Sequence, residues 1–208
     1  MGFYSNYIFP RAMESTLKKE PFTTFRRELL ADVKGDVLEI GFGTGLNMPH
    51  YNAEQVKKIT TVDPNPGMNK RAQKRIADAS IAVENHMLSG EELPLENDCF
   101  DAVVSTWTLC SISDVEQSLK EIRRILKPGG RFYFIEHGLC DDPKLQKWQH
   151  RLTPIQKIVG SGCHLNRNMK TLVEKQEFTF LQIDQFYAED VPRIGGFTYR
   201  GIAEKPER

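Results

Sequence analysis

A nine-residue stretch, Val37-Leu38-Glu39-Ile40-Gly41-Phe42-Gly43-Thr44-Gly45, constrains the fold of this chain most. Its first half is a short apolar run that is typical of a buried strand. Its second half carries three glycines in the spacing GxGxG, which lets the backbone turn sharply and present N–H groups to a ligand. A turn of this kind connects a strand to a helix, so we expect a helix to start at about Leu46.

Further strand and helix signals alternate along the chain. Strand-like runs occur at residues 36–41, 58–63, 81–86, 100–105, 131–136, 178–186 and 196–204. Helical patterns occur at 66–79, 114–126, 143–160 and 168–177, with Asp114 as an N-cap and a stop at Lys127-Pro128-Gly129-Gly130. Five strands alternating with helices predict an α/β fold: a Rossmann-like, doubly wound, mostly parallel seven-stranded sheet with helices on both faces. The last two strands are expected to form an antiparallel hairpin at its edge.

Charge and composition narrow the classes of partner. The 28 basic and 28 acidic residues cancel, so we expect no bulk attraction to nucleic acid or to an anionic membrane. Residues 1–16 contain no long apolar run, which predicts no signal peptide or spanning segment and a cytoplasmic protein, and leaves peripheral membrane contact open. The four cysteines, Cys99, Cys110, Cys140 and Cys163, are far apart with no CxxC pair. Their spacing therefore suggests neither a metal site nor a disulfide framework.

Two classes of cofactor could use the glycine turn. The dinucleotide fingerprint is GxGxxG, whereas this chain has Leu46 in place of the third glycine, and Glu39 would lie near the phosphates. S-adenosylmethionine has no phosphate and carries an ammonium and a sulfonium, so a carboxylate beside the turn favours it. Asp63, 18 residues after Gly45, could accept both ribose hydroxyls, although NAD enzymes place an acid there as well. An NAD(P)-dependent oxidoreductase is therefore the alternative on the same fold.

Four motifs together resemble the class I S-adenosylmethionine-dependent methyltransferases. They are VLEIGFGTG at 37–45, which looks like the first motif of that family, Asp63 as its ribose-binding acid, ENDCFDAVVS at 96–105 as its fourth-strand motif, and LKPGGRFYFIE at 126–136 as the turn and strand that follow. The motifs occur in the family's order and spacing. The resemblance implies S-adenosyl-L-methionine as cofactor and S-adenosyl-L-homocysteine as product.

A closer resemblance is to the thiol methyltransferase-like branch (methyltransferase type 11, UbiE-like), whose membrane-associated animal members methylate small alkyl thiols. It is carried by DPNP at 63–66, SGE at 89–91, TWTLCSI at 106–112 and the Glu136-His137 pair, with further matches at Trp148-Gln149, Pro154, Gly162-Cys163, Leu165 and Arg167. Those animal members have a hydrophobic N-terminal anchor that has no counterpart in residues 1–16. The adenine-binding Asp of many class I enzymes is also missing, with Ser89 in its place.

The resemblance implies a set of site residues. The cofactor-binding residues would be Glu39, Gly41, Gly43, Gly45, Asp63, Pro64, Ser89, Gly90, Glu91 and Thr106. The catalytic candidates follow the fourth and fifth strands: Trp107, Glu136 and His137, the last as a general base or a thiolate-stabilising cation. His137 could instead form only local hydrogen bonds, and Trp107 could pack in the core. Cys110 is expected to be a buried thiol rather than a nucleophile.

The same resemblance implies one domain over residues 1–208. Residues 1–34 would form an N-terminal helical lid with an aromatic face, 35–137 the cofactor-binding core, and 138–208 the acceptor-side helices and the edge hairpin. The methyl acceptor would be a small molecule, with a thiol as one candidate and a quinone or a phospholipid headgroup amine as alternatives. No Asn/Asp-Pro-Pro-aromatic sequence follows the fourth strand, which argues against a nucleic-acid acceptor.

A non-catalytic module that retains this fold is the remaining alternative. A module of that kind is expected to have lost residues of the cofactor loop, whereas Glu39, the three glycines and Asp63 are all present. The sequence gives no indication of the oligomeric state.

Overall fold

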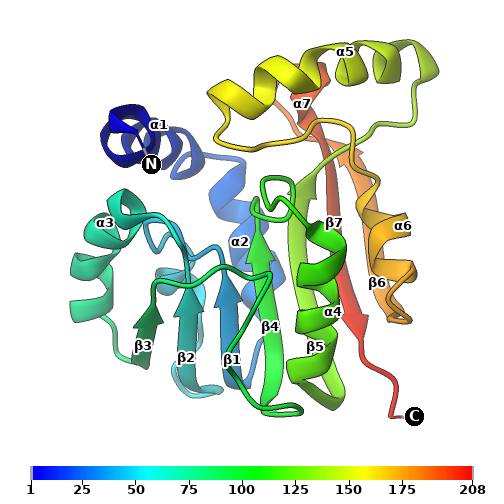
Figure 1. Ribbon diagram of the computed structural model, residues 1–208. Coiled ribbons are helices and arrows are strands. Elements are labelled where there is room, and N and C mark those ends of the chain that lie inside the picture. Colours follow the sequence, from blue (N-terminus) through cyan, green and yellow to red (C-terminus); the bar gives the residue numbers. More distant parts are fainter. Residues whose placement is uncertain (1, 208) are drawn as a thin grey trace.

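A seven-stranded sheet forms the centre of the computed structural model, in which residues 2–207 are described (Figure 1). The strands are β1 (Gly35–Ile40), β2 (Val56–Val62), β3 (Ala82–His86), β4 (Phe100–Thr106), β5 (Leu126–His137), β6 (Thr179–Tyr187) and β7 (Phe197–Glu204). Their order is β3-β2-β1-β4-β5-β7-β6. β1 to β5 pair in parallel, whereas β7 is antiparallel to both β5 and β6. This confirms the predicted sheet and its edge hairpin.

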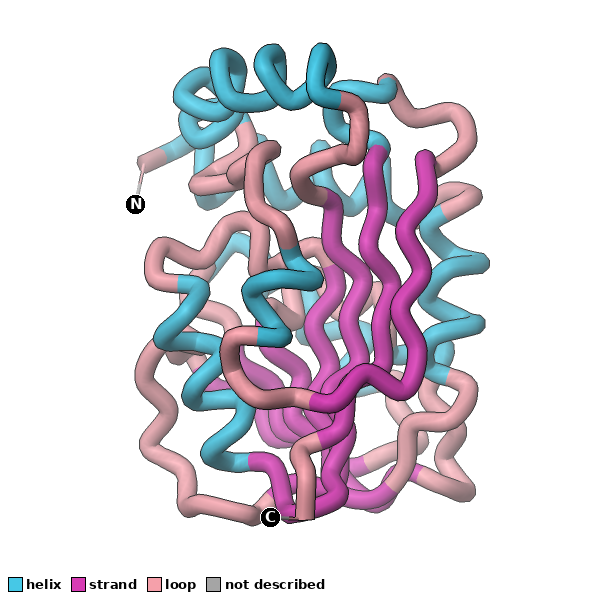
Figure 2. Tube along the Cα trace, turned by 90° about the vertical axis from the view of Figure 1, so that its right-hand side faces the viewer, coloured by secondary structure: helices cyan, strands magenta, loops and turns pink. Residues whose placement is uncertain are grey.

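Helices cover both faces of the sheet and one of its ends. They are the π-helix η1 (Tyr4–Ile8), α1 (Phe9–Leu17), α2 (Phe22–Leu30), the 3-10 helix η2 (Met48–His50), α3 (Pro66–Ala77), α4 (Val115–Ile125), α5 (Pro143–Val159), α6 (Met169–Glu174) and α7 (Arg193–Gly196). Helices α4 and α6 contribute to one apolar core, and α2 and α3 to the core on the opposite face. Helices α1 and α5 lie at the carboxyl ends of the parallel strands, and Figure 2 shows α5 above the sheet from the side.

Polar caps and apolar stripes explain where the central helices form. The side chain of Asn65 accepts hydrogen bonds from the backbone of Gly67 and Met68 at the start of α3. Asp114 caps α4 as predicted, by accepting from the backbone N–H of Gln117. In α4 the apolar positions Leu119, Ile122 and Ile125 are fully buried against the sheet. The spacing of these residues was sufficient to place the helix.

The predicted helix at about Leu46 is wrong. Only the single 3-10 turn η2 forms there, because the side chains of Asn47 and Tyr51 turn inward to Glu39 and Pro49 has no backbone N–H to donate. The connection between β1 and β2 therefore lacks an α-helix, as does the stretch 87–99 between β3 and β4. The helix–strand alternation is thus less regular than predicted.

One other local prediction differs from the structure, and one short helix was not predicted. The Lys127-Pro128-Gly129-Gly130 stop lies within β5, which begins at Leu126, and a shift in its register against β4 accommodates the extra residues. Helix α7 comes just before β7 and was not predicted, because four residues that include two glycines carry no helical periodicity.

The N-terminal helices connect the two sides of the molecule at the carboxyl ends of the strands. Glu14 of α1 forms ion pairs with Arg71 and Arg75 of α3. On the other side, the hydroxyl of Tyr4 donates to the backbone oxygen of Val159 at the end of α5, at 2.7 Å. The predicted helical segment outside the sheet is therefore present. Within residues 2–207, none of the helices combines the length and the apolar character needed to cross a membrane.

Candidate active site

A cavity of about 370 Å³ lies at the carboxyl ends of β1, β2 and β4, beneath the N-terminal helices. Its lining includes predicted and unpredicted residues: Ser5, Phe9, Met13, Glu14, Leu17, Arg26, Glu39, Ile40, Gly41, Phe42, Gly43, Thr44, Leu46, Asn47, Val62, Asp63, Pro64, Asn65, Met68, Ser89, Gly90, Glu91, Thr106, Trp107, Thr108, Ser111, Ile112, Ser113 and Ser161. Ligands of open α/β sheets bind at this end of the strands, so the position suits a cofactor site.

The glycine turn forms one wall of the cavity. Gly41 and Gly43 have φ values of +73° and +59°, a region that side chains disfavour. A Cβ at Gly41 would also lie 2.1 Å from the side chain of Thr108, whereas the space beside Gly43 is open. The guanidinium of Arg75 donates to the backbone oxygen of Thr44 at 2.8 Å and so attaches the turn to α3. The turn therefore leaves room for a ligand against its backbone.

Asp63 lies beside this turn and is hydrogen-bonded to it. Its carboxylate accepts hydrogen bonds from the backbone N–H groups of Gly43 and Asn65, both at 2.8 Å. The residue is buried, with 7% of its surface exposed, and burial raises the pKa of its carboxyl group, while these two hydrogen bonds oppose the rise. Two such bonds leave acceptor capacity on the carboxylate for ligand hydroxyls in the cavity.

Glu39 is the deeper of the two carboxylates. It accepts from the amide of Asn47 at 2.9 Å and from the hydroxyl of Tyr51 at 2.7 Å. Burial raises the pKa of Glu39 to about 7, although the bonds from Tyr51 and Asn47 and the charge of Arg26 lower it. The carboxylate is therefore held in place by neutral donors, and Arg26 offsets part of its charge.

Ser89, Gly90 and Glu91, which are expected from the sequence to contact adenine, line another part of the cavity. The Ser89 hydroxyl donates to one oxygen of Glu91 at 2.9 Å, and the other oxygen accepts from the backbone of Asp114 at 2.6 Å. A Cβ at Gly90 would lie 2.7 Å from Ile40, so the close approach of this segment to β1 requires glycine. The segment is rigidly attached to the start of α4.

Trp107 has an uncommon backbone conformation at the end of β4, with φ at +51°. Its ring lies edge-on to Phe22, with centroids 5.3 Å apart, and the Arg26 guanidinium lies 4.6 Å from the ring centroid. The preceding residue, Thr106, accepts a hydrogen bond from Asn47 at 3.1 Å. Strained residues of this kind concentrate at functional sites, and Trp107 also lines the cavity.

Glu136 lies behind the cavity wall. Its buried carboxylate accepts from the backbone N–H groups of Thr108 and Leu109, both at 2.8 Å, and of Cys110 at 3.2 Å. The Ser105 hydroxyl donates to it as well. Burial raises the pKa of Glu136, whereas the hydrogen bonds from these backbone N–H groups lower it. The side chain therefore fixes the loop that carries Trp107 and Ser111.

His137 points toward two cysteines. Its Nε2 lies 2.9 Å from the sulfur of Cys163, and its buried Nδ1 has no hydrogen-bond partner among residues 2–207. The sulfur of Cys110 completes a cluster in which the three potential ligand atoms lie within 4.8 Å of one another. The spacing of the cysteines in the sequence did not predict this cluster. Cys110 is buried, as predicted.

Most of the residues that the sequence singled out surround one cavity. Glu39, Gly41, Gly43, Asp63, Pro64, Ser89, Gly90, Glu91, Thr106 and Trp107 line it, whereas Gly45, Glu136 and His137 are outside its described lining. Gly45 packs against the ring of Phe42 instead. Sequence reasoning missed Arg26, Asn47 and Tyr51, whose roles depend on long-range pairing with Glu39 or Trp107.

Comparison with known proteins is consistent with this geometry. A family model described as a methyltransferase domain matches residues 38–134. Thiol S-methyltransferase TMT1B of Rattus norvegicus is 35% identical over 195 residues, which cover 87% of this chain and 78% of the relative. The chain belongs to the S-adenosylmethionine-dependent methyltransferases. Human thiol S-methyltransferase TMT1A is 32% identical, over 82% of this methyltransferase and 71% of the human protein.

The fold of the methyltransferase also matches solved structures. An S-adenosylmethionine-dependent methyltransferase from Thermotoga maritima superimposes with a TM-score of 0.67, at 20% identity and with 97% of each chain covered. At this identity the match concerns the fold alone. It agrees with the seven-stranded sheet order described above.

Proposed function

We propose that the cavity binds S-adenosylmethionine and that the enzyme transfers its methyl group to a small thiol. The observation that carries the cofactor assignment is the charge of the cavity wall. Among its described residues, Glu39, Asp63 and Glu91 are acidic and only Arg26 is basic, whereas Glu14 is neutralised by its ion pairs with Arg71 and Arg75. Such a wall attracts a cation-bearing nucleoside and repels a diphosphate.

The residues at the strand ends fit this cofactor. Glu39 would hold its ammonium, Asp63 its ribose hydroxyls, and the backbone beside Gly41 and Gly43 would approach it closely. The segment 89–91 would contact the adenine. When bound, the cofactor supplies an electrophilic methyl group on a sulfonium. The protein's contribution is to orient an acceptor toward it, and orientation can be worth about 7–11 kcal/mol.

The acceptor assignment is supported by the relatives and by the apolar residues that line the cavity. Both relatives described above are named thiol S-methyltransferases and match most of the chain. The lining also contains Phe9, Met13, Leu17 and Trp107, whose apolar side chains suit a small hydrophobic molecule. A thiol as acidic as that of cysteine has an unperturbed pKa of about 8.5, so a few per cent of it ionises near neutral pH without a strong base.

Within this proposal, Trp107 acts as an acceptor-side residue and Glu136 as a positioning residue for the loop that carries it. The catalytic role of His137 stays a prediction, since its Nε2 faces Cys163.

An assay panel tests the acceptor class. Purified enzyme and S-adenosylmethionine are incubated with small alkyl thiols, phenols, quinols and amines, including a phospholipid headgroup amine. We expect S-adenosylhomocysteine release and a product 14 mass units heavier with thiols. Turnover confined to quinols or amines would contradict the thiol assignment while keeping the enzyme class. Calorimetric titration with NADH beside S-adenosylhomocysteine tests the cofactor itself, and binding of NADH alone would overturn the proposal.

The affinity for S-adenosylhomocysteine should rise roughly eightfold between pH 6.0 and 7.5. With its pKa raised to about 7, Glu39 is mostly protonated at pH 6, whereas the ligand's ammonium favours the ionised carboxylate. Binding therefore releases a proton below pH 7, and affinity grows as the pH rises. Calorimetry at both pH values measures it.

Glu39→Gln is the matched variant for this pH dependence. It should bind more weakly, and its affinity should no longer change over this range. A pH dependence that persists in Glu39→Gln would assign the titration to Asp63, whose pKa burial also raises, and would contradict the role of Glu39.

A further inference from the structure

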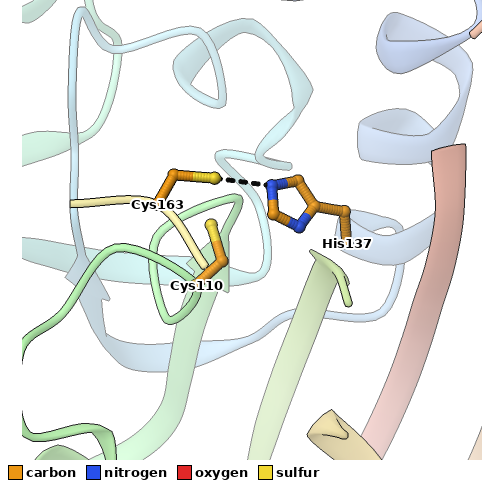
Figure 3. Close-up of side chains that lie close together, drawn as sticks. All are labelled: Cys110, His137 and Cys163. Carbon is orange, nitrogen blue, oxygen red and sulfur yellow. Dashed lines mark hydrogen bonds between the residues drawn. The ribbon is translucent and has the colours of Figure 1, made fainter. Parts of the chain in front are cut away.

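Three potential metal ligands converge behind the wall of the cavity, from segments far apart in the sequence. Cys110 lies in the loop after β4, His137 is the last residue of β5, and Cys163 follows α5. Figure 3 shows both sulfur atoms and the imidazole directed toward a common point. We propose that Cys110, His137 and Cys163 form a binding site for a thiophilic divalent metal ion of the Zn²⁺ class.

The geometry is close to what such an ion requires. Zinc binds cysteine sulfur at about 2.3 Å and histidine nitrogen at about 2.0 Å, so the ligand atoms of a tetrahedral site lie about 3.5–3.8 Å apart. The three atoms here lie within 4.8 Å of one another, and the Nε2 to Cys163 sulfur distance is 2.9 Å. Side-chain movements of about 1 Å would therefore complete the set.

Burial and charge also favour an ion. Cys110 and Cys163 are buried, with 3% and 5% of their surfaces exposed, so an ion held between them would be shielded from solvent. Without an ion, the Cys163 sulfur is paired with Nε2 of His137 and with the side-chain amide of Gln156, and an ion would replace these weak sulfur hydrogen bonds with metal–ligand bonds. On binding, each thiol loses a proton to solvent, and two thiolates neutralise the charge of a divalent cation. The site then buries no net charge of its own, which limits the desolvation cost.

Coordination by a metal accounts for the histidine, whereas a Cys110–Cys163 disulfide would not. A disulfide would use only the two sulfurs and leave the imidazole without either partner. Three protein ligands from three segments are also the arrangement that leaves one tetrahedral position for water or another ligand.

The ion would strengthen the wall of the cavity. Ser111 and Ser161 line the cavity and lie next to Cys110 and two residues before Cys163, respectively. The two loops are already in contact, since the backbone N–H of His164 donates to the oxygen of Cys110 at 2.8 Å. A metal ion would cross-link both loops to the end of β5. It would therefore stabilise the folded protein in proportion to its occupancy.

Cobalt substitution tests the site without relying on activity. The full chain is stripped of metal under reducing, anaerobic conditions and titrated with Co²⁺. We expect one equivalent to bind, with the thiolate-to-cobalt charge-transfer band and the intense visible bands of a tetrahedral site, and Zn²⁺ to displace it. Cys110→Ser and Cys163→Ser should weaken Co²⁺ binding more than about 100-fold. Cys140→Ser, which removes a buried thiol elsewhere, should leave binding unchanged.

Thermal unfolding gives a second measurement that does not depend on the variants' spectra. Zn²⁺ should raise the Tm of the wild-type protein and of Cys140→Ser, but not of Cys163→Ser. The proposal is overturned if the wild-type protein shows no thiolate-to-cobalt band, or if the band survives in both cysteine variants. It is also overturned if mass spectrometry finds a Cys110–Cys163 disulfide in the purified protein and no bound metal.

Discussion

Asp63→Ala should weaken the binding of S-adenosylhomocysteine by about 100-fold or more. The carboxylate is buried and already accepts from the backbone of Gly43 and Asn65, so it is oriented before a ligand arrives. Hydrogen bonds to a charged group are worth about 1.5–3 kcal/mol each, and 100-fold corresponds to about 2.7 kcal/mol. The substitution would remove the ribose contacts and leave the N–H of Gly43 without its partner. Isothermal titration calorimetry measures the change.

Two variants control for this effect. Asp63→Asn keeps the shape of the side chain and one acceptor oxygen. Its affinity for S-adenosylhomocysteine should therefore lie between that of the wild type and that of Asp63→Ala. Asp78→Ala removes an exposed carboxylate at the end of α3 and should bind normally. Unchanged affinity in a folded Asp63→Ala protein would contradict the ribose assignment.

Glu136→Ala should lower the free energy of unfolding by about 3–5 kcal/mol. The carboxylate is fully buried and accepts from three consecutive backbone N–H groups, those of Thr108, Leu109 and Cys110. Alanine would leave these donors without a partner inside the protein. Urea denaturation followed by circular dichroism measures the loss. Glu204→Ala, which removes a half-exposed carboxylate at the end of β7, should change stability by no more than about 0.5 kcal/mol.

Glu136→Gln separates positioning from chemistry. Glutamine keeps one carbonyl acceptor for the loop, so part of the stability should return. If Glu136 acts by holding the loop of Trp107, methyl transfer in Glu136→Gln should recover together with stability. A variant with wild-type stability and no transfer activity would instead show that the carboxylate takes part in the reaction.

Much of the cavity lining was predictable because its signals are local. The acid, the glycine turn and Asp63 lie at strand ends, and the chain order of the strands brings these ends together at one edge of the sheet. The residues 89–91 follow β3 in the same way and also line the cavity. Pattern and topology together were therefore sufficient to place most of these residues around one cavity.

The remaining features depend on contacts that local spacing does not encode. Asn47 and Tyr51 donate hydrogen bonds to Glu39 from a segment that was predicted to be helical. A buried carboxylate without donors is costly, so these hydrogen bonds form in place of a helix. Arg26 reaches Trp107 across 81 positions. The cluster of Cys110, His137 and Cys163 likewise forms only when three separate segments meet.

Arg75 joins two parts of the site that serve different purposes. One of its nitrogens donates to the backbone oxygen of Thr44 in the glycine turn, and another to Glu14 of the helix that walls the cavity, at 2.7 Å. Both hydrogen bonds depend on the one guanidinium, so a displacement of the glycine turn would also pull on α1. The helix and the turn would therefore respond to a ligand together.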